Sequence, residues 1–274
     1  MKISRRQFVA GVGAAGVAVA ADAFGFEAHR VLLSRHEVRI SGLPSGLDGL
    51  RIAQVSDVHF PGNRIAARAA LDLLHQERPD IVLLTGDMTE SLGALDEVRT
   101  FAGEARGSLA TVALLGNWEY RVGAVGNLAL DTYRSAGVDL LVNQSRTVDV
   151  GGVPLTLVGL DDPVSGLPDI SKARMSVVRG STEIWLLHAP GVVDKLLLGI
   201  QAPPAFLVAG HTHGGQIRIP FLTPVKPTGS GRFLEGWYYD TAAPLYVSRG
   251  VGTTGIPARF RCPAELPVFT LRAA

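Results

Sequence analysis

The sequence predicts an α/β fold, and two observations carry that prediction. In the first half of the chain, short apolar runs suited to buried strands alternate with helical stretches in the order β-α-β-α-β, which favours parallel crossovers. Further on, residues 146–160 contain the turn signal Gly151-Gly152 and predict a hairpin in a second sheet. The chain has 274 residues, and removing an N-terminal signal would leave a length that one α/β domain can fill.

Five of the predicted strands end at residues with metal-ligating side chains. Residues 50–55 precede Asp57 and His59, 81–85 precede Asp87, 112–115 precede Asn117, 184–187 precede His188, and 206–209 precede His211 and His213. In open α/β sheets the loops beyond the strand carboxyl ends converge on one crevice, so these side chains are predicted to meet. A cap or turn residue explains any single such ending, but five endings favour a metal centre. Helices are expected over residues 65–76, 95–105, 125–136, 170–178 and 192–198.

The segment AGHTHGGQ, residues 209–216, is the most informative of these endings. Where a strand breaks into a loop, the second of two histidines spaced by two residues can turn to face a different ion. Gly210, Gly214 and Gly215 allow the sharp turn and the close approach that this needs. The alternative is a surface turn with two solvated histidines.

The ordered set DVH, GD, GN, H and GHTH resembles the calcineurin-like metallophosphoesterase family, over roughly residues 36–272. The resemblance implies a four-layer αββα sandwich of two mixed sheets with a dimetal site at the strand carboxyl ends. Position by position, it implies that Asp57, His59 and His213 bind one ion, that Asn117, His188 and His211 bind the other, and that Asp87 bridges them. Asp87, Asn117 and His211 are also the residues it implies for catalysis.

The implied activity is hydrolysis of phosphoesters, with lipid-linked or nucleotide phosphodiesters favoured, by a hydroxide shared between the two ions. One alternative is a hydrolase similar to UDP-2,3-diacylglucosamine pyrophosphatase in lipid A synthesis, although export would separate it from that cytoplasmic nucleotide sugar. The other is a metal-binding protein with impaired catalysis.

The sequence departs from the family motif at one position. Where the family has Gly-Asn-His followed by an acidic residue, this chain reads Gly116-Asn117-Trp118-Glu119. The family histidine is thought to protonate the leaving oxygen or to stabilise the transition state, and an indole has no proton that titrates near neutral pH. Either Trp118 only packs against its loop, or Trp118 or Glu119 shapes the substrate pocket while water or a distant group supplies the proton.

Residues 1–28 predict a twin-arginine signal or an N-terminal anchor, and residues 29–274 the phosphoesterase domain. Arg5-Arg6 followed by an apolar run to Ala21 carries this prediction, and the run is too short for a confident membrane span. Residues 18–20 and 21–23 are both possible cleavage sites for the signal. The alternative to a twin-arginine signal is an ordinary secretory signal. Residues 247–257 and 259–266 resemble the exported, membrane-associated phosphodiesterase branch of the family. We therefore expect a periplasmic location or the outer face of the cytoplasmic membrane, with a membrane surface as a candidate partner.

Charge, cysteine content and the predicted export route each bear on the partners, disulfides and metal ions that we expect. The formal net charge is +1 and there is no long Lys/Arg run, so the sequence gives no indication of a nucleic-acid-binding surface, and it makes no prediction of the oligomeric state. The single cysteine, Cys262, cannot form an internal disulfide and is expected to be buried. A twin-arginine substrate folds before export, so two Mn or Fe ions are favoured, and Zn is the alternative.

Several other residues carry weaker predictions. The segment 220–243 is either a wall of the substrate site or a surface excursion. Asp161 and Asp162 either approach the metal centre or form an Asx turn before Pro163. Of the histidines outside the motifs, which are His29, His36 and His75, the last is expected to be solvated on a helix.

Overall fold

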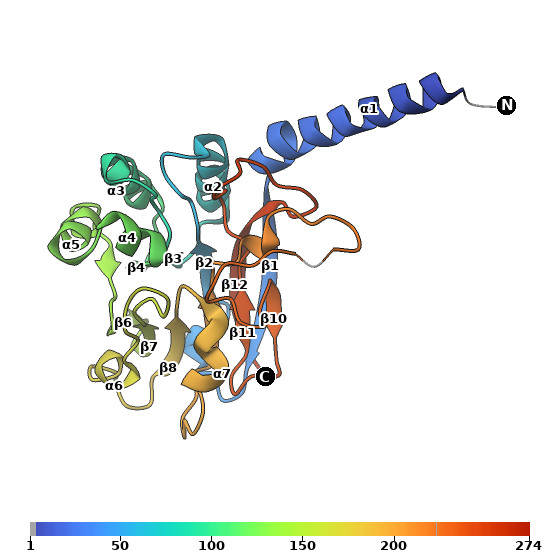
Figure 1. Cartoon of the computed structure of the whole chain (residues 1–274). Coiled ribbons are helices and arrows are strands. Elements are labelled where there is room, and N and C mark those ends of the chain that lie inside the picture. The colour runs from blue at the N-terminus through green and yellow to red at the C-terminus, as the bar shows by residue number, and fades with distance from the viewer. Residues whose placement is uncertain (1–3, 223) are drawn as a thin grey trace.

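The computed structural model describes residues 4–222 and 224–274, in which two six-stranded mixed sheets lie between outer helices (Figure 1). The first sheet has the order β1 (Val31–Ile40), β12 (Ala264–Ala273), β2 (Arg51–Val55), β3 (Ile81–Thr85), β4 (Ala110–Leu114) and β5 (Asp139–Leu140). The second has the order β10 (Gly236–Tyr238), β11 (Leu245–Val247), β9 (Phe206–Ala209), β8 (Thr182–Leu186), β7 (Val153–Gly159) and β6 (Gln144–Val150). The predicted α/β class with two mixed sheets is confirmed.

The sequence order of the strands explains their direction. β2, β3, β4 and β5 run parallel because helices connect most of them, as the β-α-β-α-β alternation predicts. β6 and β7 form the predicted antiparallel hairpin around Gly151-Gly152, and β7, β8 and β9 continue the second sheet in parallel. The carboxyl ends of the parallel strands in both sheets therefore carry the loops in which the candidate ligands lie.

The central strands of both sheets, such as β3, β4 and β9, are buried on both faces, which makes four layers. Along β3, Val82 and Leu84 pack in the core beneath the outer helices, while Ile81 and Leu83 pack between the sheets. The core between the sheets is completed by side chains of the second sheet such as Leu157 and Val208. A third cluster, around the fully buried Trp185, lies between the second sheet and its outer helices. This alternation explains why the strands read as continuous apolar runs.

The helices of the described residues are α1 (Arg5–Ala21), α2 (Arg64–Glu77), α3 (Leu95–Glu104), α4 (Asn117–Val122), α5 (Gly126–Ser135), α6 (Ile170–Ala173) and α7 (Val193–Leu196). The predictions for α2, α3 and α5 are correct to within one residue at each end. α6 and α7 are much shorter than predicted. After α6 the chain continues in single turns, and Met175, at 82% exposure, has no core to pack against.

Helix α1 projects from the body of the protein in Figure 1, and hydrogen bonds to the main chain of residues 259 and 261 hold its base. Ala23 is buried and its carbonyl accepts a hydrogen bond from the Arg259 amide at 3.0 Å. The Glu27 carboxylate accepts one from the Arg261 amide at 2.9 Å. Within residues 4–222 and 224–274, no helix combines the length and the apolar character needed to cross a membrane.

Candidate metal centre

Six of the seven predicted ligands form two buried groups in the described part of the chain. One group is Asp57, His59 and His213, and the other is Asp87, His188 and His211. Within each group the ligand atoms lie within 4.8 Å of one another. Side chains that are far apart in the sequence meet here because β2, β3, β8 and β9 end at the same edge of the two sheets.

The Asp87 carboxylate joins the two groups. Its Oδ2 atom lies 3.2 Å from His188 Nε2 in its own group and 3.8 Å from His59 Nε2 in the other. The Trp118 amide donates a hydrogen bond to Oδ1 at 2.8 Å and so fixes the orientation of the carboxylate. This position between the groups is the one that a shared ligand needs.

The contacts among the histidines fit metal ions better than they fit ordinary packing. His59 Nε2 lies 2.9 Å from His213 Nε2, and His188 Nε2 lies 3.2 Å from His211 Nδ1. Facing ring nitrogens at these distances need a proton or a cation between them or beside them, because their lone pairs otherwise repel. Imidazole nitrogens and carboxylate oxygens are ligands that divalent first-row ions accept.

Asn117 adds an oxygen that has no hydrogen-bond partner among residues 4–222 and 224–274. Its Oδ1 atom is buried and accepts no hydrogen bond, although buried amide oxygens are normally paired. Asn117 directly precedes Trp118, whose amide donates a hydrogen bond to Asp87. The Asn117 residue therefore lies close to Asp87. An unpaired oxygen next to two groups of ligands fits a metal site.

Five of the candidate ligands have left-handed backbones, with φ between 49° and 72°. These residues are Asp57, His59, Asp87, His211 and His213. Such a conformation costs about 1 kcal/mol or more for a residue with a side chain and collects at functional sites. The strain turns each side chain out of its strand direction and toward the centre.

Hydrogen bonds to main-chain carbonyls orient two of the histidines. His188 Nδ1 lies 2.8 Å from the Thr85 carbonyl, so Nδ1–H donates and Nε2 is left free to bind. His211 Nε2 lies 2.8 Å from the Thr228 carbonyl, which leaves its Nδ1 free. Because Thr228 belongs to the segment 220–243, that segment forms part of the wall of the site.

His59 has a carboxylate partner that the sequence did not reveal. Its Nδ1 atom lies 2.9 Å from Glu90 Oε1, close enough for an ion pair although the alignment is poor for a hydrogen bond. The Thr254 hydroxyl donates to the same oxygen at 2.7 Å. A carboxylate behind a ligating histidine raises its basicity, and Glu90 follows Asp87 by three residues in a loop that begins with a ligand.

The pKa values suit ligands that bind cations. Burial, together with the charge of the neighbouring His188, lowers the pKa of His211 to about 4, so His211 is a neutral ligand near pH 7. Burial opposes ionisation of Asp87, but His188 and His59 hold its pKa at about 2. The shared carboxylate is therefore charged at any physiological pH.

Glu119 supports the site from beneath and does not face a pocket. Its buried carboxylate accepts hydrogen bonds from the amides of Asp87, Met88, Thr89 and Gly116 at 2.6 to 3.2 Å. It ties the loop after β3 to the start of α4, a helix that the sequence analysis missed. The Gly-Asn-Trp-Glu spacing carried a signal for α4, because an acidic residue at the third helical position can cap the first turn. Glu119 therefore acts through the loops that carry the candidate ligands, and the shaping of the pocket by Trp118 or Glu119 stays a prediction.

Trp118 lies at the edge of the centre. Its ring is half-buried and stands edge-on to the His59 ring, with centroids 6.0 Å apart. The Arg121 guanidinium lies 4.4 Å from the centre of the Trp118 ring, and Arg121 is exposed. The indole therefore separates a metal ligand from a cation at the surface.

The remaining predicted residues occupy different places. Asp162 Oδ2 accepts from the amides of Val164 and Ser165, which is the Asx turn. Asp161 accepts a hydrogen bond from the Tyr120 hydroxyl at 2.5 Å, and neither aspartate belongs to the ligand groups. His75 is exposed and Cys262 is buried, as predicted.

The chain is similar in sequence to known phosphoesterases. Residues 50–215 match the family model for calcineurin-like phosphoesterases. A Bacillus subtilis protein named uncharacterized metallophosphoesterase YkuE is 29% identical, with 99% of each chain covered. Escherichia coli phosphodiesterase YaeI is also 29% identical, covering 98% of this chain and 99% of its own. The solved Haemophilus influenzae NAD nucleotidase NadN aligns with a TM-score of 0.48 and 16% identity, covering 74% of this chain and 45% of that one.

The family explains the two groups of ligands as a dinuclear metal site, and it assigns a hydrolytic activity toward phosphoester bonds. The chain belongs to the calcineurin-like phosphoesterase family.

Proposed function

We propose that this protein is a phosphodiesterase that hydrolyses lipid-linked or nucleotide phosphodiesters outside the cytoplasm. The observation that carries the proposal is the position of Asp87 between two buried groups of ligands, beside the unpaired Asn117 oxygen. The preference for diesters is supported by the name of the Escherichia coli relative.

Each ligand has a proposed role. Asp57, His59 and His213 would hold one ion, Asn117, His188 and His211 the other, and Asp87 both. Two divalent ions bound there would activate water and offset charge on the phosphoryl group. Only Asp57 and Asp87 among these ligands carry negative charge, so two divalent ions would leave net positive charge facing the substrate.

The chain's own residues keep these ligands in place during the reaction. The Trp118 amide and the amides bound by Glu119 hold the loops that carry Asp87 and Asn117. The Asp57 carboxylate accepts the His211 amide at 3.0 Å, which couples a ligand of one group to the backbone of the other. A site held in this way changes little when substrate binds, which favours electrostatic stabilisation of the transition state.

The presence of Trp118 leads us to expect a preference for substrates with good leaving groups. With indole in place of imidazole, this position cannot supply the leaving group with a proton, so good leaving groups should react best. This replacement also supports the second candidate function, a metal-binding protein with impaired catalysis.

The test is hydrolysis of bis(p-nitrophenyl) phosphate and of p-nitrophenyl phosphate by purified protein whose metal content has been measured. We expect two metal ions per chain and faster turnover of the diester. Stoichiometric metal without turnover of either compound would favour the impaired protein, and faster turnover of the monoester would refute the diester preference.

Export and metal identity form one connected proposal. Arg5-Arg6 and the following apolar helix support twin-arginine export, and a chain that folds before export can retain cytoplasmic Mn or Fe behind a slow off-rate. The test is to export the protein once with its own signal and once with a signal that exports unfolded chains, and to identify the bound metal by mass spectrometry in each case. We expect Mn or Fe in the first case and Zn in the second, and the same metal in both would refute retention.

A further inference from the structure

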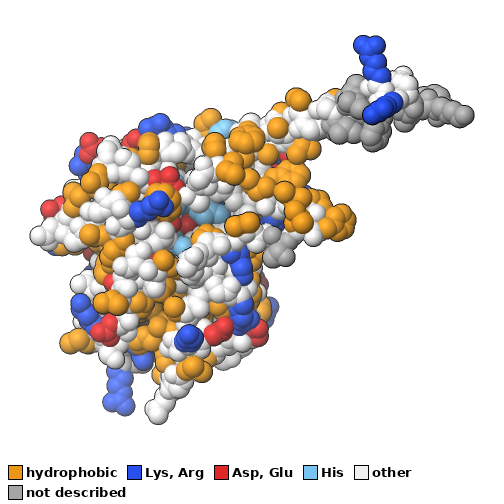
Figure 2. Space-filling view, in the orientation of Figure 1, with side chains coloured by type: hydrophobic (Ala, Val, Ile, Leu, Met, Phe, Trp, Pro, Cys, Tyr) orange, Lys and Arg blue, Asp and Glu red, His pale blue; other side chains and the backbone are white. Residues whose placement is uncertain are grey.

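Large apolar side chains are exposed together beside the base of α1. They are Phe24, Phe26, Ile219, Phe221, Leu222, Val225 and Ile256, which we call the apolar rim. Phe221 is fully exposed and Val225 is 84% exposed. Figure 2 shows orange side chains collected at the base of the helix and on the adjoining loop. Single exposed apolar residues need no explanation, but a contiguous group of this size marks a surface that binds something.

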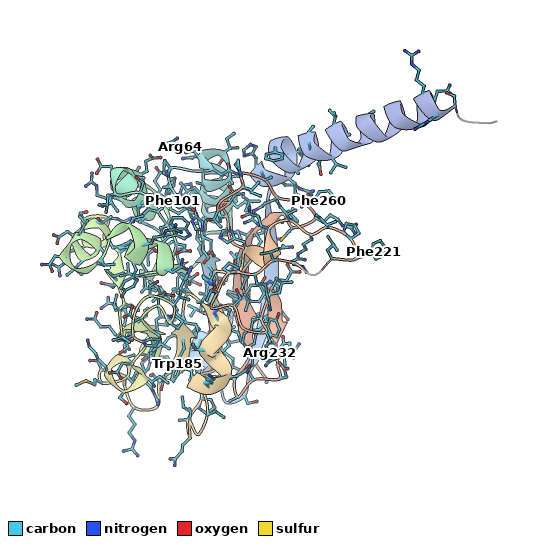
Figure 3. The ribbon with its side chains drawn as sticks, viewed as in Figure 1. Arg64, Phe101, Trp185, Phe221, Arg232 and Phe260 are labelled. Atoms are coloured by element: carbon cyan, nitrogen blue, oxygen red, sulfur yellow. The ribbon has the colours of Figure 1, made fainter. Side chains whose placement is uncertain are left out.

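Backbone hydrogen bonds make the apolar rim one surface. Ala23, at the base of α1, binds the Arg259 amide through its carbonyl. One residue further, Phe260 pairs with the start of the protruding loop: its amide donates to the Gln216 carbonyl at 3.0 Å and its carbonyl accepts from the Arg218 amide at 2.9 Å. Figure 3 labels Phe260 near the base of α1 and Phe221 at the tip of this loop. The helix base and the loop are thus held side by side.

The apolar rim borders the metal centre. A cavity of about 490 Å³ is lined by Ile219, Val225 and Ile256 of the rim and also by the candidate ligand His213. The thiol of Cys262, next to the base of α1, contacts the His213 carbonyl at 3.3 Å. Histidine side chains are visible in a hollow in Figure 2, beside the orange patch. A molecule held by the rim would therefore lie next to the ligands.

The charges around the rim are mainly positive. Arg30 lies 5.9 Å from the centre of the Phe26 ring and is exposed, as is Arg261. The exposed acid at the base of α1 is Asp22, while the Glu27 carboxylate is bound to the amides of residues 261 and 262. Between Gln7 and Ala21, α1 contains no charged residue. Apolar side chains bordered by arginines are suited to a surface with an apolar interior and anionic headgroups.

We propose that the apolar rim docks onto a phospholipid bilayer, with Phe221 and Leu222 inserted among the lipids. A bilayer fits better than a protein partner because the apolar residues continue directly into the uncharged α1 and because the flanking charges match anionic lipids. Resting on the proposed function, this inference also narrows the substrate to an amphiphilic phosphodiester, whose apolar part would occupy the cavity beside His213.

The test places an environment-sensitive fluorophore on the loop of the full chain. Val225→Cys receives the fluorophore, and Leu198→Cys, at a position 76% exposed just after α7, is the matched control. The native Cys262 is buried, so the unaltered chain reports background labelling. Vesicles contain equal parts of phosphatidylglycerol and phosphatidylcholine. We expect a blue shift and quenching by lipid-borne quenchers at position 225 but not at position 198.

A second measurement uses the double variant Phe221→Ser, Leu222→Ser. Removing two inserted apolar side chains should weaken vesicle affinity about tenfold or more, while hydrolysis of bis(p-nitrophenyl) phosphate stays unchanged, since neither residue lines the cavity. Docking is refuted if the fluorophore at position 225 does not respond to vesicles, or if it responds to protein concentration alone, which would make the rim an interface between proteins. Failure of the metal-loaded native chain to hydrolyse the soluble diester would refute the proposed function and leave the vesicle result standing.

Discussion

Replacing Gly116 with alanine should remove metal and activity without unfolding the protein. Gly116 has φ −107°, an ordinary value, so the substitution causes no backbone strain. The added Cβ would lie 2.6 Å from the Asp87 amide nitrogen and 2.8 Å from His188 Cε1, and closer still to the Asp87 carboxylate. Since non-bonded carbon contacts normally exceed about 3.3 Å, the ligands must move apart by about 0.5 to 1 Å.

That displacement sets the expected magnitudes. A misplacement of about 1 Å at a reacting centre costs about 100-fold in rate, and overpacking costs about 1 to 3 kcal/mol in the free energy of unfolding. We therefore expect Gly116→Ala to lower kcat/KM by at least that factor and to lower the metal content, while the protein remains folded. Phosphodiester kinetics, mass spectrometry of bound metal and urea unfolding measure the three quantities.

Gly93→Ala is the matched control for this experiment. Its backbone φ is not in the left-handed region, and its nearest contact would be Ser91 Oγ at an ordinary 3.6 Å. The control should retain metal and activity. Full metal content and normal turnover in Gly116→Ala would refute the view that the close approach of Gly116 to Asp87 and His188 is needed to build the centre.

Four further predictions follow from the same contacts. Asp87→Asn should lose metal and activity together, because Asp87 faces both groups of ligands; normal metal content by mass spectrometry would contradict this. Glu90→Gln should weaken metal affinity about 10- to 100-fold through loss of the carboxylate behind His59, measured by competition with a chelating dye. Trp118→His should accelerate diesters with poor leaving groups most, and an equal effect across a leaving-group series would show that Trp118 acts only in structure. Removing metal with a chelator should lower Tm by about 5 to 10 °C if metal was present near 100 times its Kd, and an unchanged Tm in calorimetry would argue against metal bound by the folded state alone.

The sequence revealed most of the fold because its central strands are buried on both faces. A short continuous apolar run such as residues 81–85 is typical of a strand that is buried on both faces, so its position in the sheet could be predicted. Helices with a strong apolar face, such as α2, could be located to within one residue. The predicted helices over 170–178 and 192–198 proved too long, because beyond their first turns only single side chains such as Leu197 reach the core, while Met175 and Leu198 are exposed. Helical propensity alone does not sustain such a short segment.

The sequence by itself indicated the candidate ligands, since residue type and placement after buried strands pointed to all seven, but the same pattern also offered Asp161 and Asp162, which belong to neither group. Only the tertiary structure decided what lies around them. The Glu90 carboxylate behind His59, the Thr228 carbonyl behind His211, and the exposure of the apolar rim beside the metal centre each join segments that are distant in the chain. Local sequence patterns report the period of a strand or helix, whereas these contacts depend on how two sheets and their loops pack, and that packing is a property of the whole chain.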